Sequence, residues 1–187
     1  LGGIMGGSAT SAQWQASVPG GSFSPADTDL NATYTPPAAY SGNITLTLTT
    51  NSPSCGQATA SKQLTVVATP TANAGPAIGP ICQGGTTAGL GGSFSGSATA
   101  PTWSTAAGGS FAPNANTPNA TWTPPAAFSG TATLVLTTSG GGCGTATASK
   151  DIVVQPNPTA NAGPAMAAIC QGGNSAALNG AVGGSAT

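Results

Sequence analysis

The sequence repeats itself with a period of about 88 residues, and this repeat constrains the fold more than any other feature. NATYTPPAAYSG at 31–42 returns as NATWTPPAAFSG at 119–130, and ATASK, PTANAGP and ICQGG each occur twice. A unit of this length is too long for a solenoid repeat and has the size of one small β-sandwich domain. The sequence therefore predicts small domains in series rather than one large core.

The sequence begins and ends out of phase with this repeat. If PTANAGP opens each domain, residues 71–158 form one complete unit, residues 1–70 form a unit that lacks its first strands, and residues 159–187 open a third unit. Leu1–Thr10 also resembles Leu178–Thr187. We therefore expect the chain to be a segment of a longer tandem array.

Hydrophobic alternation predicts strands throughout and no helices. ITLTLTT (44–50) alternates apolar residues with threonine, and TATLVLTT (131–138) repeats the pattern. A period of two indicates a strand with one buried face, and threonine suits the solvated face. Each of these strands is expected to form a hairpin with the segment that opens at Lys62 or Lys150. Further strands in the complete unit are expected near 78–82, 86–95, 98–104 and 119–123.

Side chains at equivalent positions of the two copies suggest structural roles. Trp14 and Trp103 are expected to fill the cores of their sandwiches. Lys62 and Lys150 open the last strand of each copy, where we expect them to be solvated or to guard a sheet edge. Proline cannot donate to a β-ladder, so the Pro-Pro pairs at 36–37 and 124–125 are expected to end a strand.

Charge is almost absent, and this excludes several classes of function. Charged residues make up 3% of the 187 residues, and the chain has no His, Glu or Arg. Nucleic-acid binding requires Lys and Arg, and acid–base catalysis most often uses His. We expect no enzyme, no cofactor, no metal site and no nucleic-acid partner. The charged residues are Lys62, Lys150, Asp27, Asp29 and Asp151.

The weakly charged surface favours self-association. The formal net charge is −1, so electrostatic repulsion does little to keep copies apart. No apolar run reaches the roughly 18–20 residues that a transmembrane helix needs. Hydroxyl groups or covalent glycans must therefore solvate the surface, and filaments are an expected product of association.

The order of these motifs resembles a known family. The sequence ANAGP, a strand with a single Trp, and the run from TPPAA to LTLTT are together similar to the PKD-like and immunoglobulin-like repeats of long surface proteins of Bacteroidota-type bacteria. The resemblance covers nearly the whole chain. It implies an all-β fold of tandem immunoglobulin-like sandwiches, an extracellular location, and a role as a spacer, adhesin or fibre rather than in catalysis.

The four cysteines are also repeated in register. Cys82, Trp103 and Cys143 follow the Cys–Trp–Cys order of immunoglobulin domains, which implies a Cys82–Cys143 disulfide. Cys55 and Cys170 would then pair with cysteines outside residues 1–187. The alternatives are Cys55–Cys82 with Cys143–Cys170, or unpaired buried thiols. Disulfides would indicate an oxidising, extracellular compartment.

Three asparagines lie in Asn-x-Ser/Thr sequons, namely Asn31, Asn43 and Asn119. This motif is the acceptor for N-linked glycans, and the Ser/Thr-rich surface also permits O-linked glycans. We treat all three as possible glycosylation sites.

These observations predict a structural extracellular protein that forms a stalk, filament or fibre. The repeats would stand in series in one long chain, or separate subunits would exchange strands, with 159–187 completing the first unit of another chain. The alternative function is an adhesin or carbohydrate-binding module, which would need an exposed aromatic platform such as Trp122 or Tyr34.

Overall fold

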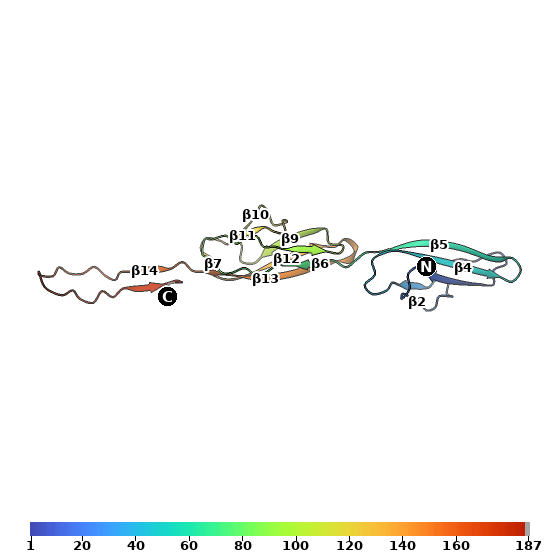
Figure 1. Ribbon diagram of the computed structural model, residues 1–187, viewed down its shortest axis with the longest axis horizontal. Helices are drawn as coiled ribbons and strands as arrows, with labels where there is room; N and C mark the ends of the chain where they lie inside the picture. The colour runs from blue at the N-terminus through green and yellow to red at the C-terminus, as the bar shows by residue number, and fades with distance from the viewer. Residues whose placement is uncertain (186–187) are drawn as a thin grey trace. The chain divides into compact units, whose positions relative to one another are not determined.

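The computed structural model describes residues 1–185, and its regular secondary structure is almost entirely β-strand (Figure 1). The chain divides into two compact units, Leu1–Thr69 (unit 1) and Pro70–Thr187 (unit 2). The finer division at 70/71 and 158/159 remains a prediction.

Unit 2 contains the complete repeat. Four strands form one sheet in the order β7-β13-β12-β9, and the short pairs β6–β8 and β10–β11 supply the opposite layer. The strand bounds are β6 Thr71–Asn73, β7 Ile81–Cys82, β8 Ser93–Ser95, β9 Ala100–Thr105, β10 Ser110–Ala112, β11 Thr121–Thr123, β12 Gly130–Ser139 and β13 Thr145–Gln155. A 3₁₀ turn, Gly141–Cys143, connects β12 to β13, and β14 (Thr159–Asn161) pairs with β15 (Ala181–Gly183) beyond the sandwich strands.

Unit 1 repeats this architecture without the strands that correspond to β6 and β7. Its main sheet has the order β1-β4-β5, and β2 pairs with β3. The strand bounds are β1 Ser11–Ala16, β2 Ser22–Ser24, β3 Thr33–Thr35, β4 Gly42–Ser52 and β5 Gly56–Val66.

The predicted alternation of apolar residues with threonine determines which side chains form the core of each unit. Leu134 and Leu136 of β12 are fully buried, as is Ile44 of β4, while Thr45 and Thr47 lie on the other face and are half-buried. Trp14 and Trp103 are buried as expected, and the indole Nε1 of Trp103 donates to the Pro118 carbonyl at 3.0 Å. The core of unit 2 contains Ala74, Leu90, Trp103, Ala120, Trp122, Ala132, Leu134, Leu136, Ile152 and Val154.

Several strand boundaries differ from expectation. The last strands begin at Gly56 and Thr145, well before the lysines, because the alternating Ala and Thr of ATASK also pair with the preceding strand. The short strands β6 and β10 carry only three residues each, too few to give a periodic signal. The Pro-Pro pairs do follow the ends of β3 and β11, as predicted.

The expectation for the two lysines was wrong for Lys150. Its ammonium donates to the carbonyls of Leu90 and Pro76, the latter at 2.9 Å, and lies 5.9 Å from the ring centroid of Trp103. Burial lowers the pKa of Lys150 below its usual value. Lys62 lies 5.4 Å from the ring centroid of Trp14, although its ammonium bonds only the Leu1 carbonyl. Both lysines thus connect the last strand to the segment that covers it.

Replacement of Lys150 by Met tests this connection. Lys150→Met keeps an apolar stem over Trp103 but removes two charge-assisted hydrogen bonds, so we expect a loss of about 1–3 kcal/mol in the free energy of unfolding. The matched Lys62→Met change removes one such bond and is expected to cost less. Urea unfolding followed by tryptophan fluorescence measures both, and equal losses would contradict the interpretation.

Candidate interaction surfaces

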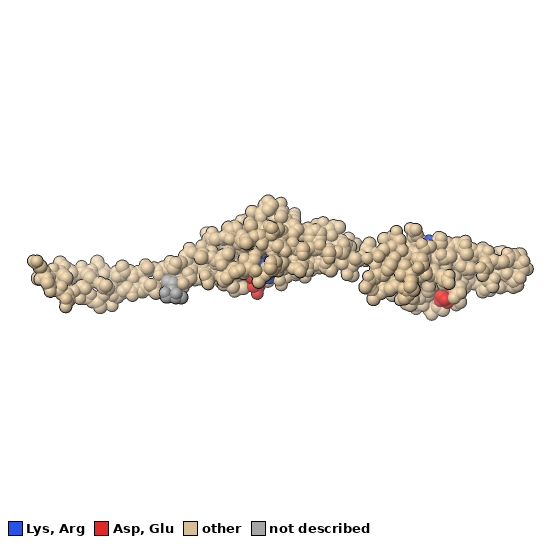
Figure 2. All heavy atoms as spheres, in the orientation of Figure 1, with Lys and Arg blue, Asp and Glu red and all other residues tan. Residues whose placement is uncertain are grey.

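The described residues carry few groups that could perform chemistry. Residues 1–185 contain no cluster of three His, Cys, Asp or Glu side chains able to hold a metal ion. Charged atoms form only a few isolated spots on the face shown in Figure 2. No helix in the described part of the chain is long and apolar enough to span a membrane.

The aromatic residues do not form a binding platform. Every aromatic side chain of the chain is buried or half-buried. Trp122 is fully buried, and its indole Nε1 donates to the Gly108 carbonyl at 3.0 Å. Tyr34, its counterpart in unit 1, is half-buried, and its hydroxyl has no hydrogen-bond partner among the described residues. Stacking of a sugar on Trp122 or Tyr34, as a carbohydrate-binding site would need, is therefore not supported.

The implied Cys82–Cys143 disulfide is absent, and the strand topology explains why. Cys82 pairs with Gln155 at the end of β13, whereas Cys143 lies in the turn just before that strand begins at Thr145. A strand of eleven residues spans roughly 35 Å. A disulfide requires Cα atoms about 4.4–6.8 Å apart, so these two cysteines are at opposite ends of the sandwich.

No disulfide joins any two of the four cysteines within the described residues. The alternative pairs, Cys55–Cys82 and Cys143–Cys170, are thus not formed either. The last alternative, that the thiols are buried, does not hold either, because Cys55, Cys82 and Cys170 are exposed. Pairing of Cys55 and Cys170 with cysteines outside residues 1–187 remains a prediction.

The three sequon asparagines are all exposed but differ in their contacts. The Asn119 side-chain oxygen accepts from the Gly91 amide at 2.8 Å, which holds the carboxamide against the loop before β8. The Asn43 side-chain oxygen accepts from the Thr65 hydroxyl at 2.9 Å. At Asn31 the backbone amide donates to Asp29, and within residues 1–185 no such bond holds the carboxamide. Glycosylation at any of them remains a prediction.

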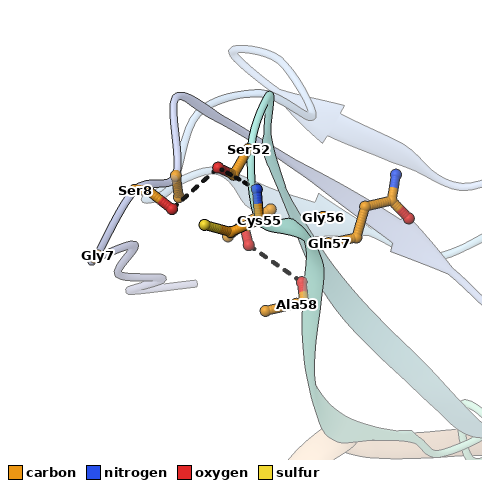
Figure 3. Close-up of a pocket in the computed structure, with 10 residues that line it drawn as sticks. Gly7, Ser8, Ser52, Cys55, Gly56, Gln57 and Ala58 are labelled. Atoms are coloured by element: carbon orange, nitrogen blue, oxygen red, sulfur yellow. Dashed lines mark hydrogen bonds between the residues drawn. The ribbon is translucent and has the colours of Figure 1, made fainter.

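A hollow of about 230 Å³ lies beside the β4–β5 turn of unit 1 (Figure 3). Cys55 lines it together with Ser8 and Ser52, whose hydroxyls are 3.0 Å apart, and the Cys55 amide donates to the Ser52 hydroxyl at 3.3 Å. Hydrogen bonding by Ser8, then by Ser54 and Ser52, lowers the pKa of the exposed Cys55 thiol below its usual value. The hollow thus presents a thiol, the group among its lining residues that is most open to chemical modification.

The inner face of β5 in unit 1 is partly exposed, whereas the same face of its counterpart in unit 2, β13, is covered. Ile152 and Val154 are fully buried in unit 2, but the equivalent Leu64 and Val66 are only half-buried. The side chain of Ile4, which lies in the segment beside this face, is 88% exposed. Two hollows of about 200 Å³ each lie here, lined by residues 2–6, Leu48 and residues 58–62, with Trp14 and Thr50. We call this region the open face of unit 1.

The C-terminal segment, residues 159–185, repeats the sequence that covers the core in unit 2 but exposes its own apolar side chains. Its large apolar side chains are exposed, with Met166 at 46% and Ile169 at 56%, while the equivalent Ile78 and Ile81 pack against the core of unit 2. Of the eight exposed large hydrophobic side chains in the described residues, only Val153 lies outside unit 1 and this segment. They are Ile4, Met5, Val67, Val153, Met166, Ile169, Leu178 and Val182.

Comparison with known proteins supports the fold. No protein-family model and no curated protein matches the chain. A crystal structure of mouse cadherin-23 repeats EC22–24 matches with a TM-score of 0.50 and 14% identity, over 79% of this chain and 54% of that chain. A titin I-band fragment, I67–I69, matches with a TM-score of 0.41 and 16% identity, over 79% and 56%. The chain spans about half the length of each of these structures. The cadherin-23 match and the strand topology show an all-β fold with immunoglobulin-like sandwiches.

The reactivity of Cys55 tests the environment described for it. Because its pKa is lowered, more thiolate is present at a given pH, and the midpoint of its alkylation rate against pH should fall below that of a small free thiol. Ser8→Ala should move this midpoint upward, because it removes the largest contribution. Iodoacetamide labelling with peptide mass spectrometry measures the rates, with Cys82 and Cys170 as internal references. An unchanged profile in Ser8→Ala would contradict the assignment.

Proposed function

We propose that this chain is a structural protein of the cell surface or extracellular space, whose sandwich repeats stand in series in a stalk or filament. The path of the chain through unit 2 carries this proposal. The chain enters at Pro70, which lies against Gly140 near one end of β13, and it leaves through Gln155 at the other end. Each complete repeat therefore advances the chain by roughly the 35 Å length of this strand, so repeats in series build length.

The composition supports a structural role over a catalytic one. A chain without His, Glu or Arg has few candidates for general acid or base, and its three aspartates are dispersed between two units. Its hydrophobic side chains alternate with Thr and Ser along the strands, a pattern that builds and solvates a sandwich. The composition therefore fits a β-sandwich scaffold better than an enzyme.

An extracellular location follows from the same proposal. The resemblance of the ANAGP and TPPAA motifs to PKD-like repeats of bacterial surface proteins supports it. The low charge gives glycans a physical role, because a surface with so few charges depends on other groups for its hydration. Glycans on Asn31, Asn43, Asn119 or the Ser/Thr-rich loops would provide that hydration.

Immunogold electron microscopy of intact source cells tests this function. An antibody raised against the recombinant chain should label filaments or stalks outside the cell, and mild protease treatment of intact cells should remove the label. A cytoplasmic marker protein serves as the control for cell integrity. Label confined to permeabilised cells would contradict an extracellular role, and diffuse external label without filaments would contradict the structural one.

A further inference from the structure

We infer that copies of this chain pair side by side, strand against strand, through one free edge of their main sheets. The free edge consists of residues 145–149 of β13, and it recurs in unit 1 as residues 57–61 of β5. In the paired state two free edges run antiparallel, with Thr147 of one copy opposite Thr147 of the other. This inference rests on the proposed structural function, to which it adds a lateral contact between chains.

The backbone groups of the free edge point outward and lack a partner strand. β7 pairs with only the last two residues of β13, and among the described residues no strand pairs with this side of β13 before them. Gln155 directs its carbonyl to this side, where it accepts from the Gln83 amide at 2.8 Å. Backbone groups alternate in direction along a strand, so the amides and carbonyls of Thr145, Thr147 and Ser149 point the same way.

The opposite edge of the same sheet is covered by a loop. The Trp103 amide of β9 donates to the Ala115 carbonyl at 2.8 Å, and in unit 1 the Trp14 amide donates to the Asp27 carbonyl at 2.8 Å. Residues 145–149 have no such cover, and they include no charge, proline or bulge of the kind that prevents pairing with another chain. Because unit 2 contains the complete repeat, this edge is free in the complete sandwich.

The two charged residues that follow the free edge are turned away from it. Lys150 points to the inner face, where its ammonium donates to the carbonyls of Pro76 and Leu90. Asp151 lies on the outer face and accepts from the Thr133 hydroxyl at 2.6 Å. Neither charge therefore opposes the approach of a second copy that presents the same edge.

A second copy matches the free edge because the residues of the edge are nearly symmetric about Thr147. In the antiparallel pair, Thr145 lies opposite Ser149 and Ala146 lies opposite Ala148. Hydroxyl side chains thus meet hydroxyl side chains on the outer face, a cross-strand pair that stabilises sheets. On the inner face alanine meets alanine, so no large side chain holds the two sandwiches apart.

This register also uses every outward backbone group of the free edge. Thr145, Thr147 and Ser149 each exchange two hydrogen bonds with the opposite residue, roughly six in all. Main-chain bonds of this kind provide the affinity when a strand is added to a sheet edge. β7 of each copy does not interfere, because the other strand turns away at Gly141–Cys143 before it reaches the end of β13.

The free edge is present twice, so one chain has two places for a partner. Residues 58–62 of β5 repeat the sequence ATASK, and Thr59 takes the place of Thr147. Residues 57–61 are exposed. A two-fold pair uses one edge of each copy and leaves the other edge available. Assembly therefore continues beyond a dimer, which joins stalks or filaments side by side.

Cysteine cross-linking tests the contact. In a chain whose four native cysteines are changed to Ser, Thr59→Cys with Thr147→Cys places one thiol at the centre of each free edge. Hydrogen-bonded antiparallel pairs have Cα atoms about 5.5 Å apart, which a disulfide bridges. Mild oxidation should therefore give disulfide-linked dimers and larger species on a non-reducing gel. The matched control carries Gln15→Cys and Ser104→Cys, exposed positions on the same sheet face at the opposite edge.

The outcomes separate this inference from the proposed function. Abundant cross-linked species in the first variant and few in the control support the contact, whereas equal yields in both variants overturn it. External filaments on cells together with failed cross-linking would leave the structural function standing and overturn only the contact. Specific cross-linking without external filaments would have the reverse meaning.

A charge placed on the free edge provides the second test. Thr59→Lys with Thr147→Lys puts like charges opposite each other in every pair of edges, and both side chains are exposed, so folding is preserved. We expect association measured by sedimentation velocity to weaken at least about tenfold. Gln15→Lys with Ser104→Lys changes the net charge equally and should associate like the parent chain. Equal weakening in both variants, or a parent chain that never associates, overturns the inference.

Discussion

The structure depends on the burial of the inner face of the β12–β13 hairpin. Leu134, Leu136 and Ile152 project from this hairpin into the core of unit 2, where they are fully buried beside Leu90, Trp103 and Trp122. A sheet with one apolar face is stable only when a second layer covers that face. In unit 2 this second layer consists of very short strands and the loops between them. These short strands and loops stabilise unit 2 more by covering the apolar face of the hairpin than by hydrogen bonds between strands.

Lys62 and Lys150, at equivalent positions of the two copies, show how the covering layer is attached. Few side chains in this chain can form charge-assisted hydrogen bonds, yet one cation in each copy is used to bond the carbonyls of the segment that crosses the core. The long stem of the lysine packs over a buried indole, so the same residue contributes apolar contact and a polar connection. A carbonyl in this position that lacked the ammonium would lose a bond within a largely apolar environment.

The long strands could be predicted because strict alternation of apolar residues and threonine over seven or eight residues indicates a strand. The repeat was evident from the motifs that occur twice, and the immunoglobulin-like class followed from the resemblance of those motifs to PKD-like repeats. The sequence was insufficient for β6 and β10, since three residues do not establish a period. The Cys82–Cys143 disulfide was wrong for another reason. The order Cys–Trp–Cys along a chain does not say at which end of a strand each cysteine lies, and the parallel pairing of Ile81 with Val154 decides that. The open face of unit 1 could have been suspected from the missing first strands, but the exposure of Leu64 and Val66 becomes evident only in the structure.

An exposed sheet edge is usually protected by charge, proline or a bulge, because it can pair with other chains. β5 carries one charged residue, Lys62, and the ammonium of that residue is directed to Leu1 rather than along the edge. The outer edge of β5 near Val66 has no paired strand among the described residues, whereas at the equivalent edge of unit 2 Ile81 of β7 pairs with Val154 of β13. The short parallel pair thus does at this edge of unit 2 what charge, proline or a bulge does at other sheet edges.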